Sequence, residues 1–132
     1  MRTPAAQPRP AGPPGRLIPG VLQGVEFAPG TARLASGSYV VLDSLVRILL
    51  ADPSLRVEVS AHTDNSGTAG ANLHLTNLQA EAVKNYLVTK GVPFQQVVAR
   101  GFGATVPLTP DTTPRGRAAN RRVEVRPSAA GP

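Results

Sequence analysis

The densest run of polar side chains in the sequence spans residues 62–67 and reads His-Thr-Asp-Asn-Ser-Gly. Asp64 in this run could accept hydrogen bonds from a ligand ammonium group. The free N–H groups at the start of a helix expected to begin near Asn72 could hold a carboxylate. Together these two features suit a zwitterionic ligand. An alternative remains open at this point: Asp64 and Asn65 could be turn residues that bond only their own backbone.

Other site chemistries fit the sequence less well. His62, Asp64 and His74 are residue types that bind metals, but a flexible loop separates His74 from the others and no fourth ligand is evident. Residues 101–103 read Gly-Phe-Gly, yet Val106 follows where a dinucleotide fingerprint needs glycine, so we interpret these glycines as turn residues. Hydrolysis needs convergent carboxylates or a nucleophile with a base, and the eight acidic residues are scattered. We therefore predict that the chain is not an enzyme and uses no metal or cofactor.

The polar run follows a segment with the periodicity of a strand. In residues 55–62, Leu, Val, Val and Ala alternate with Arg, Glu, Ser and His, which is typical of a half-buried strand. Three further strands are expected at residues 24–27, about 97–102 and 121–126. The last two of these are separated by a turn-rich loop that contains Pro107, Pro110 and Pro114.

Apolar residues at helical spacing predict two helices. The first has its apolar stripe at Leu42, Leu45, Val46 and Leu49. Ser36 or Ser38 is available as its N-cap, and Pro53 closes it. The second begins near Asn72 and stops at Lys90 and Gly91. Its expected apolar stripe consists of Leu75, Leu78, Ala82, Val83, Tyr86 and Leu87.

The resulting order, β-α-β-α-β-β, predicts an α/β (α+β) fold with a small mixed four-stranded sheet and two main helices on one face. The strand at residues 55–62 should be internal. With 132 residues, the chain has room for one compact domain, which we place at residues 20–127. Residues 1–19 are rich in proline and are expected to form a linker or tail, and residues 128–132 a flexible tail; neither end should contribute much to the core.

Two classes of partner are not supported by the composition. No run of about 20 apolar residues is present, so no transmembrane segment is expected in this chain. The net charge of +6 could indicate a nucleic-acid-binding surface, but the basic residues are not interleaved with aromatic residues and no nucleic-acid-binding motif is present. We therefore expect neither nucleic acid nor the membrane interior as a partner.

Several spaced motifs resemble the OmpA-like domain family (the OmpA C-terminal, peptidoglycan-associated domain). Residues 61–67, Asn72 and residues 75–83 are similar to the family pattern G-H-T-D-x-x-G…N-x-x-L-S-x-x-R-A-x-x-V. Residues 25–27 resemble its first strand. The family's ending, G-x-G…P…G-R-A-x-N-R-R-V-E, is matched by residues 101–103, Pro107 and residues 116–124. The resemblance extends over about residues 21–127.

The resemblance implies a periplasmic domain that binds the diaminopimelate residue of peptidoglycan peptide stems. Such a domain anchors a larger protein, associated with the outer membrane or cell wall, and other envelope proteins are further possible partners. By this resemblance Asp64 contacts the diaminopimelate ammonium. The implied ligand site consists of Asp64, Thr63, Asn72, Gln79 and Phe27.

Position 79 departs from the family pattern in its chemistry. The family has an arginine fifteen positions after the aspartate, where it clamps the ligand carboxylate, and this chain has Gln79. Glutamine has no charge and cannot form a bidentate ion pair. Losing a charge-assisted hydrogen bond costs about 1.5–3 kcal/mol, or roughly 10- to 150-fold in affinity. Asn72, Gln79 and Tyr86 lie seven apart, so position 79 should still border the ligand site.

Two functions therefore remain open from the sequence. In the first, the domain binds the stem through Asp64, Asn72, the helix N-terminus and a nearby arginine, with Arg121 and Arg122 as the first candidates. In the second, it is a degenerate OmpA-like domain that has lost the arginine clamp and serves as a protein-interaction or structural unit.

Overall fold

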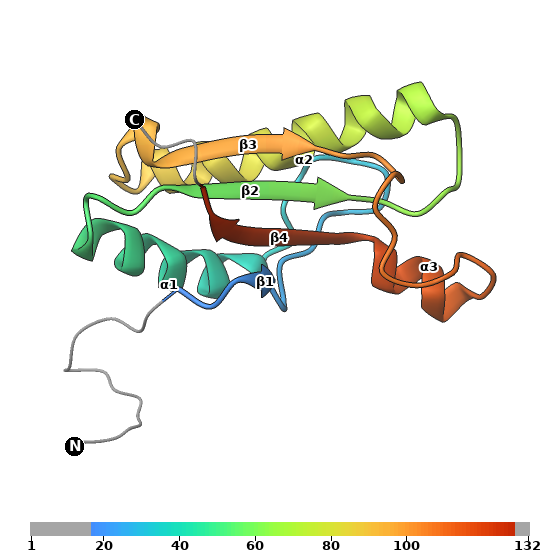
Figure 1. Ribbon diagram of the computed structural model, residues 1–132, viewed down its shortest axis with the longest axis horizontal. Coiled ribbons are helices and arrows are strands. Elements are labelled where there is room, and N and C mark those ends of the chain that lie inside the picture. Colours follow the sequence, from blue (N-terminus) through green and yellow to red (C-terminus); the bar gives the residue numbers. More distant parts are fainter. Residues whose placement is uncertain (1–16, 129–132) are drawn as a thin grey trace, which may run out of the picture.

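The computed structural model describes residues 17–128. The expected linker residues 1–16 and tail residues 129–132 lie outside this described part. A mixed sheet with three α-helices forms the domain (Figure 1). Within residues 17–128, no helix is both long enough and apolar enough to cross a bilayer.

The sheet has four strands in the order β1-β4-β2-β3. Their bounds are Gly20–Val21 for β1, Val57–His62 for β2, Val97–Gly101 for β3 and Arg122–Pro127 for β4. β2 pairs in parallel with β3 and antiparallel with β4, so the strand expected at residues 55–62 is internal (Figure 1). The mixed four-stranded sheet predicted from the sequence is confirmed.

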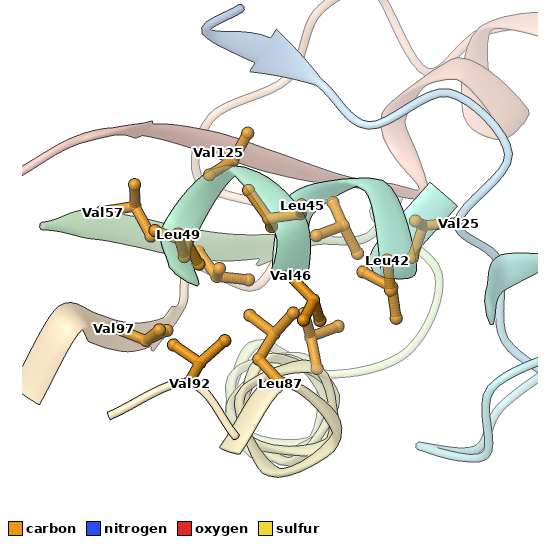
Figure 2. Packing of buried hydrophobic residues seen from close by; sticks show 13 residues of the cluster. Val25, Leu42, Leu45, Val46, Leu49, Val57, Leu87, Val92, Val97 and Val125 are labelled. Atoms are coloured by element: carbon orange, nitrogen blue, oxygen red, sulfur yellow. The ribbon is translucent and has the colours of Figure 1, made fainter. Parts of the chain in front are cut away.

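The hydrophobic core lies between the sheet and two helices, α1 (Ser38–Ala51) and α2 (Ala69–Thr89). Figure 2 shows the apolar stripe of α1 directed at valines of β2, β3 and β4 and at Leu87 of α2. The cluster residues of β2 and of β4 are every second residue of the strand, Val57 and Val59 in one and Val123 and Val125 in the other, and therefore point to one face of the sheet. Burying each such side chain stabilises the fold by about 1.5–3 kcal/mol.

The first strand does not lie where the sequence predicted it. β1 is Gly20–Val21, paired with Glu124 and Val125 of β4, whereas residues 24–27 contribute only an isolated bridge between Phe27 and Leu34. The cause is backbone geometry: Gly24 has φ +94° and Gly30 has φ +72°, so the chain turns at both points. Between the two turns, Glu26 bonds Ser38 at the start of α1, and Phe27 packs against the core without pairing with a strand of the sheet.

The helix caps also differ from the expected ones. Neither Ser36 nor Ser38 caps α1: its N-cap is Gly37, without a side-chain cap, and the Ser38 hydroxyl instead bonds the backbone N–H and C=O of Glu26. α2 begins three residues before Asn72, because the Thr68 hydroxyl accepts a hydrogen bond from the N–H of Ala71.

A third helix, α3 (Pro114–Asn120), occupies part of the expected loop between β3 and β4. It was missed because its seven residues show no apolar periodicity. Its start carries two ordinary signals: Pro114 lies in the first turn, and the Thr113 hydroxyl caps the helix by accepting from the N–H of Gly116. A single turn of 3-10 helix, η1 (Phe94–Gln96), precedes β3.

The buried face of α2 is rotated from the predicted stripe. Leu78, expected in the core, is 47% exposed, and the buried residues are Asn72, Thr76, Gln79, Ala80, Val83, Lys84 and Leu87. The reason is a close approach between α2 and β3. A Cβ built on Gly101 would lie only 2.2 Å from the backbone nitrogen of Asn77. The interpretation of Gly101 as a turn residue is therefore wrong, whereas Gly103, with φ +59°, does lie in a turn.

Candidate ligand-binding cleft

A cleft of about 600 Å³ opens at the carboxyl end of β2. Three parts of the chain form its walls: residues 25–30, the segment from His62 into α2, and the junction of α3 with β4. In Figure 1 these parts meet at the end of the sheet to which the β2 arrow points. The five residues that the sequence indicated as a ligand site all line this cleft, namely Phe27, Thr63, Asp64, Asn72 and Gln79.

Asp64 is the most deeply placed charged group of the polar run, with 7% of its side chain exposed. Its Oδ1 accepts a hydrogen bond from the N–H of Ser66 at 2.9 Å, and its Oδ2 contacts the guanidinium of Arg121. Burial raises the pKa of this carboxyl, but the hydrogen bonds from Ser66 and the contact with Arg121 outweigh burial and lower the pKa below its ordinary value. Asp64 is thus both a turn residue and an ionised group facing the cleft.

The two consecutive arginines of the α3–β4 junction are held very differently. Arg122 is 3% exposed and donates to Glu124 Oε2 at 2.6 Å and to the carbonyl oxygens of Val106 and Asn120 at 2.8 and 3.2 Å. Arg121 is 53% exposed and contacts Asp64. Of the two arginines that the sequence offered, Arg121 is therefore the one beside Asp64.

Gln79 has a partner that sequence reasoning missed. Its Nε2 donates to the carbonyl oxygen of Thr31 at 3.0 Å, which joins α2 to the turn at residues 28–33. The carbonyl can only accept, so it fixes which end of the amide faces the turn. Residues 28–30 form part of the cleft wall, and Gln79 therefore supports that wall. The two partners lie 48 residues apart, so no local pattern could have indicated the bond.

The start of α2 contributes less than the sequence suggested. Asn72 donates to the backbone oxygen of Asp64 at 3.5 Å, a long bond that ties the helix to the polar loop. The N–H groups of Ala71 and Asn72 are already bonded to Thr68. Within residues 17–128, the first three residues of α2, residues 69–71, do not line the cleft. A ligand carboxylate is thus better matched by a side chain than by this helix terminus.

Tyr86, expected on the same stripe as Asn72 and Gln79, does not reach the cleft. Its hydroxyl donates to Asp43 Oδ1 at 2.5 Å on α1. Fourteen residues of helix rise about 21 Å, so Tyr86 lies near the opposite end of α2 from Asn72. The shared stripe correctly placed Gln79 beside Asn72, but it could not extend the site to Tyr86.

His62 lines the cleft as a neutral group. Its ring stacks on Phe102 with 5.2 Å between centroids, and its Nε2 lies 3.0 Å from the Ser60 hydroxyl. Burial, and then the positive charge of Arg122, lower the pKa of His62 to about 4. His74 is exposed on α2, and within residues 17–128 no three His, Cys, Asp or Glu side chains are grouped to hold a metal ion.

Comparison with known sequences relates the chain to proteins of the bacterial cell envelope. The sequence profile of the OmpA family matches residues 26–121. The peptidoglycan-binding protein ArfA of Mycobacterium tuberculosis is 37% identical over 101 residues, which cover 76% of this chain and 31% of that protein. The outer-membrane lipoprotein YfiB of Pseudomonas aeruginosa is 34% identical over 106 residues, covering 80% of this chain and 63% of YfiB. The chain thus spans about a third of the length of ArfA.

Solved structures confirm the fold. A putative MotB-like protein from Desulfovibrio vulgaris superposes with a TM-score of 0.70 at 32% identity, covering 80% of this chain and 68% of that one. The cell wall anchor of the T6SS from Pseudomonas aeruginosa gives 0.66 at 27% identity, with 75% and 71% covered. The peptidoglycan-associated lipoprotein from Burkholderia pseudomallei gives 0.73 with 84% and 91% covered, and at 24% identity this likeness concerns the fold alone.

Proposed function

Because the chain belongs to the OmpA family, we propose that it is a peptidoglycan-binding module whose cleft around Asp64 receives a diaminopimelate-containing peptide stem. Membership of this family confirms the expectation that the chain is not an enzyme. Support for peptidoglycan as the ligand comes from ArfA, which is named a peptidoglycan-binding protein and shares 37% identity with this chain.

One observation carries the choice of ligand: a buried carboxylate and an exposed guanidinium meet in the same cleft. The side-chain end of diaminopimelate carries an ammonium and a carboxylate on one carbon, attached to a short alkyl chain. Asp64 matches the ammonium and Arg121 offers a positive charge nearby. The alkyl chain can pack on apolar groups of the wall, which include Phe27, Leu75 and Val123.

We infer that the chain works in the periplasm as part of a larger envelope protein that it anchors to the cell wall. Relatives include the outer membrane porin F of Pseudomonas aeruginosa, 35% identical over 80% of this chain and 30% of the porin. YfiB is named an outer-membrane lipoprotein. In each of these proteins the matching domain accompanies further sequence, which supports a role as an anchoring module.

A second function, that of a protein-interaction or structural domain, is favoured by the state of Gln79. Its amide is uncharged and its donor group is bonded to Thr31. A domain that no longer binds the stem could retain the fold as a surface for other envelope proteins. Stem titration separates the two functions.

The test is a titration of the protein with a muropeptide whose stem contains diaminopimelate, followed by amide chemical shifts. We expect shifts concentrated at the cleft-lining residues of the β2–α2 loop and the α3–β4 junction. Asp64→Ala should abolish binding. Asp52→Asn should not change it, because Asp52 is exposed and, within the described part of the chain, its carboxylate bonds Ser54 alone. A protein that shows no shifts with millimolar stem would support the interaction-domain function instead.

A further inference from the structure

We propose, resting on the function proposed above, that Arg121 is the carboxylate-binding residue of this domain and leaves Asp64 when the stem enters. Before the ligand binds, Asp64 and Arg121 form an ion pair with each other, and on binding each exchanges this partner for a group of the ligand. The ligand ammonium takes the place of the guanidinium at Asp64, and the guanidinium turns to the ligand carboxylate. This moves the positive charge of the site from α2, where the family pattern has it, to the α3–β4 junction.

The first step of the argument is elimination among the donors that line the cleft. Arg122 is committed to Glu124 and to two carbonyl oxygens and is almost fully buried. Gln79 is uncharged, and one of its two N–H donors is bonded to Thr31. Within residues 17–128, the guanidinium of Arg121 is bonded to Asp64 alone, and half of this side chain is exposed. Among the residues described, it is the cleft-lining cation that can turn toward a ligand.

The second step is the balance of charges. A zwitterion that enters the pair breaks one ion pair and forms two, so Asp64 and Arg121 both remain compensated. A ligand with only an ammonium group would displace Arg121 from Asp64 and offer it no new partner. Asp64 itself need not move, because the N–H of Ser66 holds its other oxygen. The cleft therefore discriminates by the ligand carboxylate, even without an arginine at position 79.

The third step assigns Gln79 a different task. Its bond to the Thr31 carbonyl holds the turn at residues 28–33, and residues 28–30 of this turn line the cleft. Gln79 is thus a positioning residue in this domain. A carboxylate bound at Arg121 should accordingly lie closer to Ala118 than to Gln79, since Ala118 belongs to the same junction and also lines the cleft.

The experiment compares two stems on two variants. One stem has the free side-chain carboxylate of diaminopimelate, and the other has that group converted to a carboxamide. For the unaltered protein we expect the amidated stem to bind at least about tenfold more weakly, since a charge-assisted hydrogen bond is lost. Arg121→Gln should largely remove this difference between the stems, because neither stem then finds a guanidinium for its side-chain group or has to displace one from Asp64.

Arg126→Gln is the matched control. Arg126 is 56% exposed, close to the 53% of Arg121, and it is also paired with a buried carboxylate, that of Glu124, but it does not line the cleft. The Arg126→Gln protein should bind both stems as the unaltered protein does. Amide spectra should show that Arg121→Gln keeps the fold outside the cleft, and the comparison of the two stems on the unaltered protein requires no variant.

The outcomes are distinguishable. If the unaltered protein binds neither stem, the proposed function fails and this inference fails with it. If it binds both stems equally well, or if Arg121→Gln weakens both stems by the same factor, the domain binds stems but Arg121 is not the carboxylate partner. If Arg121→Gln still prefers the free stem by the factor seen for the unaltered protein, the inference is likewise overturned.

Discussion

At position 79, a neutral side chain supports a wall of the cleft where the family pattern places a charged ligand contact. The amide of Gln79 bonds Thr31. A substitution of Gln79 therefore has two separable effects, one on the stability of the cleft wall and one on the affinity for the ligand. An arginine has five N–H donors in a planar fork, so it could bond the Thr31 carbonyl and still present donors to a carboxylate. Glutamine, with its two N–H donors, cannot supply the charge.

We therefore predict that Gln79→Arg strengthens binding of a diaminopimelate stem by at least about tenfold. The dissociation constant, measured by titration calorimetry or chemical shifts, checks this. Gln79→Ala is the control: it removes the bond to Thr31, and should lower the free energy of unfolding by about 1 kcal/mol without adding a charge. If a folded Gln79→Arg protein shows no gain, the cleft has been remodelled at more than one residue, and the interaction-domain function becomes the better explanation.

His62 gives a prediction about pH. Its pKa is lowered to about 4 in the folded protein, first by burial and then by Arg122, whereas an unfolded histidine titrates near 6.5. Between these values the unfolded chain binds more protons than the folded one. Stability should therefore fall as the pH is lowered from about 6.5 to about 4, by roughly 3 kcal/mol or less, and this contribution should not change further below that range.

Urea unfolding measured at several pH values checks this prediction. His62→Gln, which cannot titrate but can still bond the Ser60 hydroxyl, should reduce the slope of stability against pH in this window. His74→Gln serves as control, because it makes the same substitution at an exposed position of α2. An unchanged slope in His62→Gln would show that other groups, Asp64 and Glu124 first among them, dominate the pH dependence.

At the scale of elements, the contact between α2 and β3 sets the position of the cleft. The helix lies so close to the strand that a Cβ on Gly101 would meet backbone atoms of Thr76 and Asn77 at 2.4 and 2.2 Å. The Thr76 hydroxyl and the Asn77 side chain also bond the N–H groups of Gly103 and Gly101 at 2.9 Å each. These contacts fix the first half of α2, which carries Asn72 and Gln79 into the cleft.

We predict that Gly101→Ala destabilises the domain by about 1–3 kcal/mol or more, because the backbones of α2 and β3 must move apart. Thermal or urea unfolding measures this directly. Gly70→Ala is the matched change in α2: nothing lies within 4 Å of its added Cβ, so stability should stay the same or rise by up to about 1 kcal/mol. A Gly101→Ala protein as stable as the unaltered one would mean that the two elements are not in such close contact.

The elements also show what the sequence could predict and why. Strict alternation in residues 55–62 correctly gave β2, and apolar spacing from Leu42 to Leu49 correctly gave α1. Burial of one regular face drives both patterns. The position of β1 was predicted wrongly because it depends on the turn at Gly24. The buried face of α2 was predicted wrongly because it depends on the close contact of this helix with Gly101 of β3. Apolar periodicity indicates neither feature. α3 was missed because it buries almost no apolar surface of its own.

At the scale of the whole molecule, the cleft is built from segments that are distant in the sequence. Phe27, Asp64, Gln79 and Arg121 come from four separate parts of the chain, and only the resemblance to a family linked Phe27 to the others before the structure. Residue types and local spacing did identify Asp64. The Asp64–Arg121 pair spans 57 positions, and the choice between Arg121 and Arg122 required three-dimensional geometry.

The limits of the folding unit can be tested by trimming. Residues 1–19 and 128–132 were expected to contribute little to the core. Leu17 is half-buried against the core cluster, and the N–H of Ser128 bonds the carbonyl of Arg56 at 2.8 Å. One residue of each expected tail therefore contacts the domain. Removing residues 1–16 should therefore leave the melting temperature nearly unchanged, since this proline-rich segment offers no apolar periodicity to bury.

Removing residues 1–19 should lower the melting temperature further, because Leu17 is lost. Its partial burial is worth about 1 kcal/mol, which corresponds to a decrease of roughly 4–8 °C in the melting temperature of a domain of this size. Both trimmed proteins should bind the stem as the full chain does, because the cleft-lining residues lie between Val25 and Val123. A decrease of ten degrees or more on removal of residues 1–16 alone would contradict this picture, and would mean that the proline-rich segment itself packs against the domain.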